Sequence, residues 1–390
     1  MSVALIGSSL IVEDASLNKS EHLLRLSGGN TGNFAYIRGL KEIIAGPCEL
    51  FRWDTPPEIV GEKCNVVVLA CANQLGPHTD LGHFAKHLEK IGLPIVAFGL
   101  GAQAQSFDHK ASLTEGTKRW VEVLCAHAPT AKPNIGVRGE YSRQVLEDLA
   151  LGDRASITGC PSNFINLDVG LSERLERKYK TLNLSRVAVA AGLPYWPELQ
   201  RMEEALANIV DSTKGLYVTQ HELNMIRLAR NEFEDIDAKT LSLLNRYIRP
   251  KLSSAEFKVW CQRHAVCFID AASWMETLRN FDFVVGPRFH GVMLALQSGT
   301  PGGVIAHDSR TLELCQTMQI PVRHFKDIEV EIRLESLSSI FEFDAQAYRN
   351  RRIELGGRSM DILRSGGVTP AAGLKALVED SDLAAARQAA

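Results

Sequence analysis

Arg288 and His290 lie two residues apart in the segment FDFVVGPRFHGVMLALQSGTPGGVIAHD, residues 281–308. An arginine guanidinium is always charged, and its planar fork can bond two oxygens of a phosphate or carboxylate at once. A histidine imidazole ordinarily titrates near neutral pH and can therefore move a proton. Arg288 therefore predicts a site for an anionic ligand, and His290 is the group beside it that titrates near neutrality.

The residues around this pair predict the elements that position it. Residues 283–285 form a β-branched and aromatic run typical of a buried strand. Residues 292–296 suit a buried helix with Gly299 as its C-cap, and a second strand follows. The pair therefore falls where the carboxyl end of a strand meets the N-terminus of a helix. In open parallel sheets ligands bind at this edge, and the free N–H groups of the helix favour anions.

Arg138 has a similar predicted place in the segment NIGVRGEYSRQVLEDL. It follows a short apolar strand and precedes a helix that begins near Glu140. It could hold an anion as Arg288 does. A salt bridge with Glu140 or Asp148 explains the residue equally well from the sequence.

Two glycine-rich loops offer further ligand contacts. The segment RLSGGNTGNFAY, residues 25–36, lacks the G-x-G-x-x-G order of a dinucleotide site, and it does not directly follow a clear strand. The segment FGLGAQAQSF, residues 98–107, ends a strand at Gly101, and Gln103 follows as a neutral donor. Either loop could also be a tight turn with positive φ and no ligand.

The sequence predicts no metal site and no nucleophile. His83 and His87 share a helix face, but no spaced carboxylate or fourth ligand accompanies them. Ser162 lacks the G-x-S-x-G elbow of a hydrolase. The cysteines have no C-x-x-C pair and no obvious basic partner. They are scattered through the chain at positions 48, 64, 71, 125, 160, 261, 267 and 315.

Composition sets the outer bounds. The chain has 390 residues, of which 45% are hydrophobic and 23% are charged, and this is the balance of a globular protein of about two domains. A formal charge of −3 gives no general attraction to nucleic acid, so any anion site is local. No apolar run approaches about 18 residues, and the first residues do not form a signal peptide. We therefore expect a cytoplasmic protein without a membrane span.

Strands alternate with helical stretches along the whole chain, and this pattern predicts an α/β protein with parallel sheets covered on both faces. We predict two Rossmann-like domains facing a cleft, an N-terminal domain at 1–170 and a C-terminal domain at 171–350, followed by a helical tail at 351–390. The predicted strands are 3–7, 65–71, 94–101, 135–139, 156–160, 186–192, 215–220, 265–270, 281–286 and 302–308.

The segment VVGPRFHGVMLALQSGTPGGVIAHDSRTLELCQTMQIP, residues 284–321, resembles the C-terminal signature of the polysaccharide pyruvyl transferase family. That signature is an apolar strand, Arg-x-His-Gly, a small-residue helix, Gly-x-Pro, a strand, and an Asp followed by Lys. GNTGN, VAFGLGAQ and IGVRGEYSRQVLEDLALGDRASITGCPS resemble three further family segments in the same order. The resemblance spans roughly residues 25–325, and its specific part is the Arg-x-His-Gly block.

The chain also departs from the family pattern. The segment ACANQLG, residues 70–76, stands where a glycine-rich triplet is common, and GCPS, residues 159–162, replaces a Pro-Asp-Pro-like segment. Gly139 follows Arg138 where the family usually has Asp, and Arg310 stands in place of Lys.

The resemblance implies a fold similar to the glycosyltransferase B fold and a pyruvyl transferase of polysaccharide or exopolysaccharide biosynthesis. Phosphoenolpyruvate would be the donor, and no cofactor or metal is expected. The acceptor would be a sugar that is lipid-linked, nucleotide-linked or polymeric, and peripheral contact with a membrane stays open. Arg288 and His290 are the expected catalytic pair, with His290 moving a proton. The expected substrate-binding residues are Arg138, Gly291, Asn30, Gly32, Asn33, Gly101, Gln103, Asp308 and Arg310.

Two alternatives from other classes stay open. The first is a glycosyltransferase that uses a nucleotide sugar, which would need a carboxylate for the ribose, with Glu313 or Asp308 as candidates. The second is a carbohydrate-binding relative that has kept the fold and lost turnover. The departures from the family pattern at 71–73, 139 and 160–162 favour this second alternative.

Overall fold

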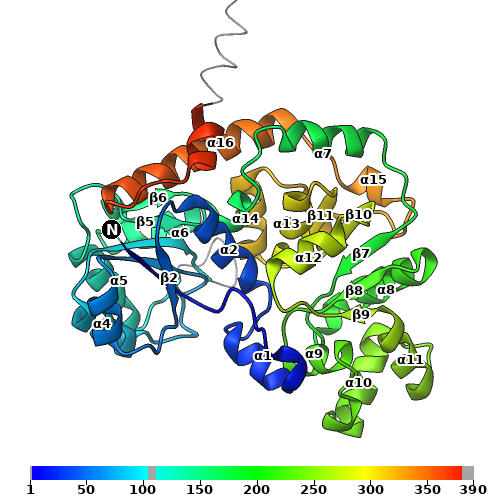
Figure 1. Cartoon of the computed structure of the whole chain (residues 1–390). Helices are drawn as coiled ribbons and strands as arrows, with labels where there is room; N and C mark the ends of the chain where they lie inside the picture. The colour runs from blue at the N-terminus through cyan, green and yellow to red at the C-terminus, as the bar shows by residue number, and fades with distance from the viewer. Residues whose placement is uncertain (1, 104–110, 380–390) are drawn as a thin grey trace, which may run out of the picture.

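The computed structural model describes residues 2–103 and 111–379, which form two α/β domains (Figure 1). Each domain contains a six-stranded sheet in which all the strand pairs are parallel. The first sheet has the order β2-β1-β3-β4-β5-β6 and the second the order β12-β11-β10-β7-β8-β9. In both sheets the order reverses direction beside the first strand of the domain, which is the topology of a doubly wound fold. The prediction of two Rossmann-like domains is confirmed.

The strands of the first sheet are β1 (Val3–Ile6), β2 (Cys48–Phe51), β3 (Val66–Ala70), β4 (Ile95–Leu100), β5 (Ile135–Val137) and β6 (Ala155–Ile157). Those of the second are β7 (Val187–Ala190), β8 (Leu216–Val218), β9 (Ala265–Val266), β10 (Phe283–Gly286), β11 (Gly302–Ala306) and β12 (Val322–His324).

The helices of the first half are α1 (Ser20–Leu26), α2 (Asn33–Ile43), α3 (Pro57–Lys63), α4 (Gly82–Ile91), α5 (Glu115–Ala126), α6 (Glu140–Glu147) and α7 (Leu171–Lys180). Those of the second half are α8 (Gln200–Thr213), α9 (Leu223–Ala229), α10 (Ala238–Ile248), α11 (Ser254–His264), α12 (Ala271–Leu278), α13 (Phe289–Ser298), α14 (Ser309–Met318), α15 (Leu337–Ile340) and α16 (Ala345–Ser365).

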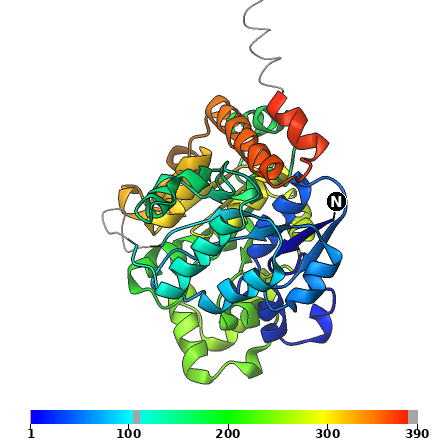
Figure 2. The same cartoon turned by 90° about the vertical axis from the view of Figure 1, so that its left-hand side faces the viewer.

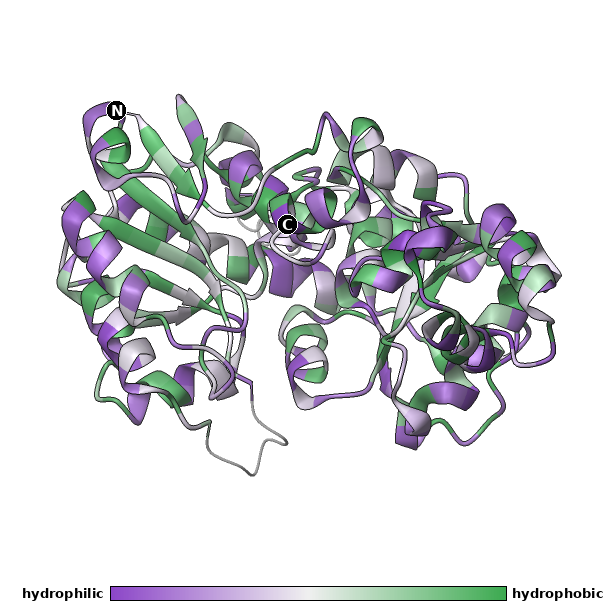
Figure 3. Ribbon diagram, turned by 90° about the horizontal axis from the view of Figure 1, so that it is seen from below, coloured by the Kyte–Doolittle hydropathy of each residue, from purple (hydrophilic) through white to green (hydrophobic). Residues whose placement is uncertain are grey.

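Both faces of the sheets are buried, as the apolar strands predicted. Along β1, Val3 and Leu5 pack into one hydrophobic cluster while Ala4 and Ile6 pack into another, because successive side chains of a strand point to opposite faces. The first of these clusters also contains Val284 of β10. The two domains therefore share part of one core. Figure 3 shows the strands of the first sheet as largely hydrophobic ribbons enclosed by mixed helices.

The sequence did not predict β2 and β12, and both are edge strands. In β2 only Phe51 is buried, and in β12 no residue is. An edge strand covered on one side alone lacks the continuous apolar run by which the central strands were recognised.

The first part of the predicted helical tail belongs to helix α16, which packs against both domains. Helix α16 begins at Ala345, contacts α7 and α14, and reaches β5 and β6 of the first domain. Figures 1 and 2 show it lying across the top of the molecule. Arg352 in its middle is buried and donates hydrogen bonds to the carbonyls of Asn163, Asn166 and Asp168. No helix among the described residues is long and apolar enough to cross a membrane.

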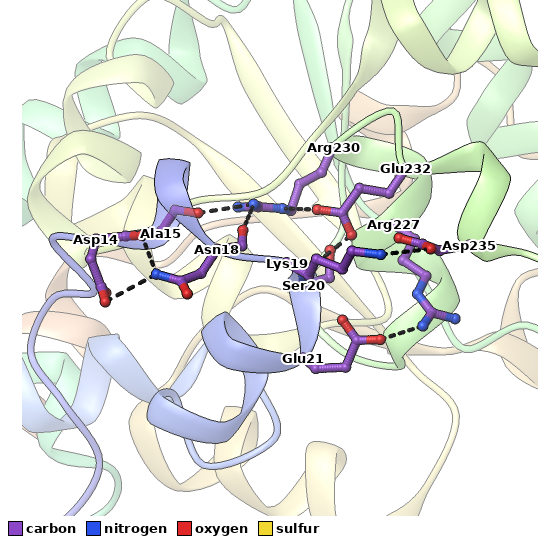
Figure 4. A network of polar contacts seen from close by, with 10 residues as sticks. All are labelled: Asp14, Ala15, Asn18, Lys19, Ser20, Glu21, Arg227, Arg230, Glu232 and Asp235. Carbon is purple, nitrogen blue, oxygen red and sulfur yellow. Dashed lines mark hydrogen bonds and ion pairs between the residues drawn. The ribbon is translucent and has the colours of Figure 1, made fainter.

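Residues 11–31 leave the first domain and pack on the second (Figure 4). Arg230, which follows α9, donates to the carbonyls of Ala15 and Asn18 and to the carboxylate of Glu232. Lys19 pairs with Asp235 at 2.9 Å. This network fixes the segment that precedes α1 to the second domain.

Candidate active site

A cavity of about 670 Å³ lies between the carboxyl ends of the two sheets. We call it the arginine cavity, because Arg138, Arg288 and Arg310 all line it. The first of these comes from the N-terminal domain and the other two come from the C-terminal domain. Of the residues that the sequence singled out, Asn30, Asn33, Gln103, Arg138, Arg288, His290, Asp308 and Arg310 form its wall.

Arg288 lies two residues after the strand β10 and is the N-cap residue of α13, at the junction of strand and helix that the sequence predicted. Its side chain is buried, and its Nε and Nη2 atoms have no hydrogen-bond partner among the described residues. Burial and the charge of Arg310 lower its pKa to about 10, although the carboxylate of Glu203 acts in the opposite direction. Buried donors without partners are costly. The arrangement therefore favours a ligand whose oxygens satisfy these nitrogens.

Arg138 follows β5 and is held in place by neutral partners. Its Nε donates to the carbonyl of Gly99 at 2.9 Å, and its Nη1 donates to the side chain of Asn73. The alternative salt bridge with Glu140 does not form, because Glu140 pairs with Arg143 at 2.5 Å. Burial comes first among the causes that lower the pKa of Arg138. Its charge thus has no bonded counter-ion among the residues that the structure describes.

His290 lies in the first turn of α13 and joins the two arginines at the cavity. Burial, with the charges of Arg138 and Arg310, lowers its pKa to about 3. The imidazole is therefore neutral at physiological pH when the cavity holds no anion. Its Nε2 lies 3.6 Å from the sulfur of Cys160. That cysteine is buried and its burial raises the pKa of the thiol, so the contact orients the imidazole and does not create a nucleophile.

Asp308 and Arg310 complete one side of the cavity at the start of α14. The Asp308 carboxylate accepts the amide N–H of Thr311 at 2.7 Å, as a helix N-cap, and pairs with Arg310 at 2.9 Å. Arg310 also donates to Gln103 of the other domain at 3.3 Å. Although burial alone would raise the pKa of Asp308, Arg310 and the other partners lower it, so this carboxylate is ionised.

The glycines predicted to bind substrate lie behind the wall rather than in it. A Cβ on Gly101 would stand 2.6 Å from Cδ of Arg138, so this glycine makes room for the arginine. A Cβ on Gly32 would stand 2.6 Å from Nε2 of Gln220, and one on Gly291 would stand 2.7 Å from Cβ of Ala190. Each of these glycines lets a neighbouring residue pack closely against the backbone behind the cavity wall.

Sequence reasoning missed several residues of the cavity wall, namely Asn73, Gln220, His221 and His307. His307 directly follows β11 and His221 lies three residues after β8. The strand-end signal that identified Arg288 could therefore have found both. Burial and the charges of Arg288 and Arg310 lower the pKa of His221 to about 4. The loop at Asn30 is joined to this region because the N–H of Thr31 donates to the carbonyl of Gln220 at 2.8 Å.

Glu313 of α14 reaches across to the N-terminus of α6. Its carboxylate accepts the backbone N–H of Ser142 at 3.1 Å and the hydroxyl of the same residue at 3.2 Å. A Cβ on Gly139 would stand 2.5 Å from Cγ of Glu313. The carboxylate of the second domain therefore occupies the space beside Arg138 where the family usually places an aspartate.

The contact of Glu313 with Gly139 and Ser142 predicts that the effects of two substitutions on the free energy of unfolding are not additive. Glu313→Ala should destabilise the fold by removing the acceptor at α6. Gly139→Asp should destabilise the fold because the new side chain would overlap with Glu313. Backbone strain would not contribute, because Gly139 is extended, with φ −171°, a conformation that any residue adopts. In the double variant the new aspartate has room, so the summed loss should shrink by about 0.5–3 kcal/mol.

Urea unfolding of the two single variants and the double variant would measure this coupling. Gln316→Ala, on the exposed face of the same helix, is the control and should change stability little. Simple addition of the two losses would contradict the contact.

A family model described as polysaccharide pyruvyl transferase matches residues 23–309. No curated protein gives a significant match.

Three solved structures align over most of the chain. The S. aureus protein MnaA with UDP is 9% identical, covers 93% of this chain and 97% of its own, and has a TM-score of 0.43. UDP-N-acetylglucosamine 2-epimerase from Rickettsia bellii is 10% identical, with coverage of 93% and 96% and a TM-score of 0.45. A putative UDP-N-acetylglucosamine 2-epimerase from Listeria monocytogenes is 11% identical, with coverage of 93% and 97% and a TM-score of 0.40. Because all three TM-scores are below 0.5, the fold class of this chain rests on its own strand order.

Proposed function

The chain belongs to the polysaccharide pyruvyl transferase family and is a transferase, and from this premise we propose that phosphoenolpyruvate is its donor. The enolpyruvate-derived group would pass to two hydroxyls of a sugar, giving a cyclic pyruvate ketal and inorganic phosphate. The observation that carries the proposal is the buried guanidinium of Arg288, whose Nε and Nη2 atoms face no partner in the described protein.

The charges of the cavity suit this donor. Phosphoenolpyruvate carries a phosphate and a carboxylate on the same carbon atom, and each of them can accept a bidentate arginine. Arg288 and Arg138 approach the cavity from opposite domains, with Arg310 between the domains through its bond to Gln103. Asp308 is the carboxylate in the described part of this wall, and Arg310 neutralises it. A trianionic ligand is therefore the expected occupant.

The reaction needs one proton at the donor and releases two from the acceptor. Protonation of the methylene carbon turns C2 into an oxocarbenium ion, to which the first sugar hydroxyl adds. Cleavage of the C2–O bond expels phosphate, and the second hydroxyl closes the ketal. One hydroxyl proton replaces the proton used at the methylene carbon, and the other leaves with phosphate. We assign His290 to proton transfer at the methylene carbon, because it is the histidine at the start of α13 beside Arg288.

The nucleotide-sugar alternative finds less support in the same cavity. It would need a free carboxylate for the ribose hydroxyls. Glu313 is bonded to Ser142 of the other domain, and Asp308 is bonded to Thr311 and Arg310. Both carboxylates are therefore already engaged.

A ligand screen with phosphate detection tests the proposal. Phosphoenolpyruvate at 100 times its dissociation constant should stabilise the protein by about 2.7 kcal/mol, whereas uridine and guanosine diphosphates should not. Phosphate release that depends on both the donor and a sugar acceptor would support transfer. Stabilisation by a nucleotide alone would contradict the donor assignment, and donor binding without turnover on any acceptor would favour a non-catalytic relative.

We also expect transfer to survive exhaustive chelation. Three guanidinium groups can neutralise the donor, and the described residues contain no cluster of metal-ligating side chains. The measurement is phosphate release before and after treatment with EDTA, with untreated protein as the control. Loss of activity that magnesium restores would contradict this donor site.

A further inference from the structure

A second cavity, of about 390 Å³, lies in the first domain at the carboxyl ends of β1, β2 and β3. We call it the tryptophan cavity after Trp53, which follows β2. It adjoins the arginine cavity, because both are lined by Gly28, Asn33, Ala72, Gln74 and Leu81. A molecule bound here can therefore extend into the proposed reaction centre.

Part of its wall is aromatic. Trp53 and Phe84 meet edge to face, with ring centroids 5.0 Å apart, and both side chains are only half-buried. Tyr36 lines the same space. Aromatic rings that are not sealed in a core can pack against a ligand. The C–H face of a pyranose ring offers a flat apolar surface of suitable size.

The rest of the wall can bond hydroxyl groups. Arg52 forms a two-bonded ion pair with Asp54, at 3.0 and 3.1 Å, which fixes a planar set of donors and acceptors. The Gln74 side chain uses its oxygen to accept the N–H of Ala72 at 2.5 Å, and its NH₂ group has no protein partner among the described residues. Sugar hydroxyls both donate and accept, so they need both kinds of group.

Arg25 adds a positive charge to this cavity. Its side chain is exposed, and it contacts the ring nitrogen Nδ1 of His22 at 3.0 Å without an ion pair to any described carboxylate. The charge of Arg52, by contrast, is balanced by Asp54. The charge of Arg25 also helps to lower the pKa of Asp54, so two arginines share one carboxylate in the described wall and a net positive charge remains for an anionic substituent. A phosphate oxygen is a strong acceptor for it.

We propose that the tryptophan cavity binds a glycosyl phosphate unit of the acceptor, with the sugar ring on Trp53 and the phosphate at Arg25. This inference rests on the proposed function, since it assumes that the hydroxyls to be modified enter the arginine cavity. A lipid diphosphate carrier and a nucleoside diphosphate carrier present the same sugar–phosphate chemistry.

Binding of small probes tests the two contacts separately. The probes are the methyl glycosides and the 1-phosphates of glucose, galactose and mannose, followed by nuclear magnetic resonance titration. Trp53→Ala should weaken both kinds of probe by at least about fivefold. Arg25→Ala should weaken the phosphates by about two- to fivefold and leave the methyl glycosides unchanged. Arg279→Ala, an exposed arginine of the second domain, is the matched control and should change neither.

The carrier is identified with the same variants. A sugar linked to uridine diphosphate is compared with the same sugar on a short isoprenoid diphosphate. The proposal is supported if one of these two ligands binds more tightly and if both Trp53→Ala and Arg25→Ala weaken its binding; that ligand then identifies the carrier of the phosphate. The proposal is overturned if neither substitution changes the binding of either ligand.

Two further results would overturn the inference. One is that no probe binds the unsubstituted protein at millimolar concentration. The other is that Trp196→Ala, across the arginine cavity, abolishes probe binding while Trp53→Ala does not. Calorimetry with phosphoenolpyruvate on the same preparations separates this inference from the proposed function. If the protein binds the donor but Trp53→Ala leaves sugar binding unchanged, only the inference is contradicted. If Trp53→Ala abolishes sugar binding but the protein does not bind the donor, only the proposed function is contradicted.

Discussion

Arg288→Ala should weaken the binding of phosphoenolpyruvate by about 2–5 kcal/mol, the cost of removing one partner of a buried charge pair. The side chain is buried at the cavity wall and its Nε and Nη2 atoms have no partner within residues 2–103 and 111–379, so few other interactions are lost with it. Arg288→Lys keeps the charge but not the planar fork, and its loss of affinity should be intermediate. Calorimetric titration of the donor gives both values.

The control for this series is Arg323→Ala. Arg323 is an exposed arginine on β12 of the same domain, outside the described cavities. Its replacement should leave donor affinity unchanged. Equal affinity for the donor in Arg288→Lys and the unsubstituted protein would show that charge alone matters, and it would remove the bidentate contact from the site.

His290→Gln should lower turnover by about two or more orders of magnitude while donor affinity stays within a few-fold. Glutamine keeps the size and the hydrogen bonding of the side chain but cannot transfer the proton. Ketal formation followed by mass spectrometry gives the rate. His87→Gln on α4, away from both cavities, is the matched control and should retain full activity. Normal turnover in His290→Gln would reduce this histidine to a structural role at the start of α13.

The pKa of His290 adds a second signature to the same variant. Burial and two arginine charges hold this pKa at about 3 in the free protein. A bound trianion offsets the charges of Arg138 and Arg310, so the pKa should rise on binding and the complex should take up protons. Calorimetry at pH 6 in buffers of different ionisation enthalpy measures this uptake, and the difference between the unsubstituted protein and His290→Gln separates it from the protonation of the donor's phosphate. His290→Gln should bind the donor with less uptake, and equal uptake would assign the proton to another group.

Two sets of contacts across the cleft hold the site in the form described. At one end, Arg230 and Lys19 tie residues 11–31 to the second domain. At the other, Glu313 binds the start of α6 beside Arg138. Arg138 and Arg288 therefore line one cavity between domains that are already joined. The losses of donor affinity predicted for the Arg288 variants thus reflect contacts with the ligand more than a change of domain arrangement.

The sequence by itself determined the central strands and the strand-end placement of the main site residues. Phe283–Gly286, the turn at Arg288 and the helix ending at Gly299 were predicted and are present. Such elements are encoded locally, by apolar runs, turn residues and caps. Because the carboxyl ends of parallel strands share one edge, the same reasoning brought Arg138 toward His290 from the other domain.

Tertiary structure alone decided the rest, because it depends on residues that are distant in sequence. Cys160 meets His290 across 130 positions and Ser142 meets Glu313 across 171, and no local pattern marks either pair. The edge strands β2 and β12 lack the buried runs of the central strands, since neighbours cover them on one side only. The low pKa of His290 likewise arises only when Arg138 and Arg310 converge on it in a buried cavity. Sequence thus fixed which groups could do the chemistry, and packing between the two domains fixed their neighbours and their charge.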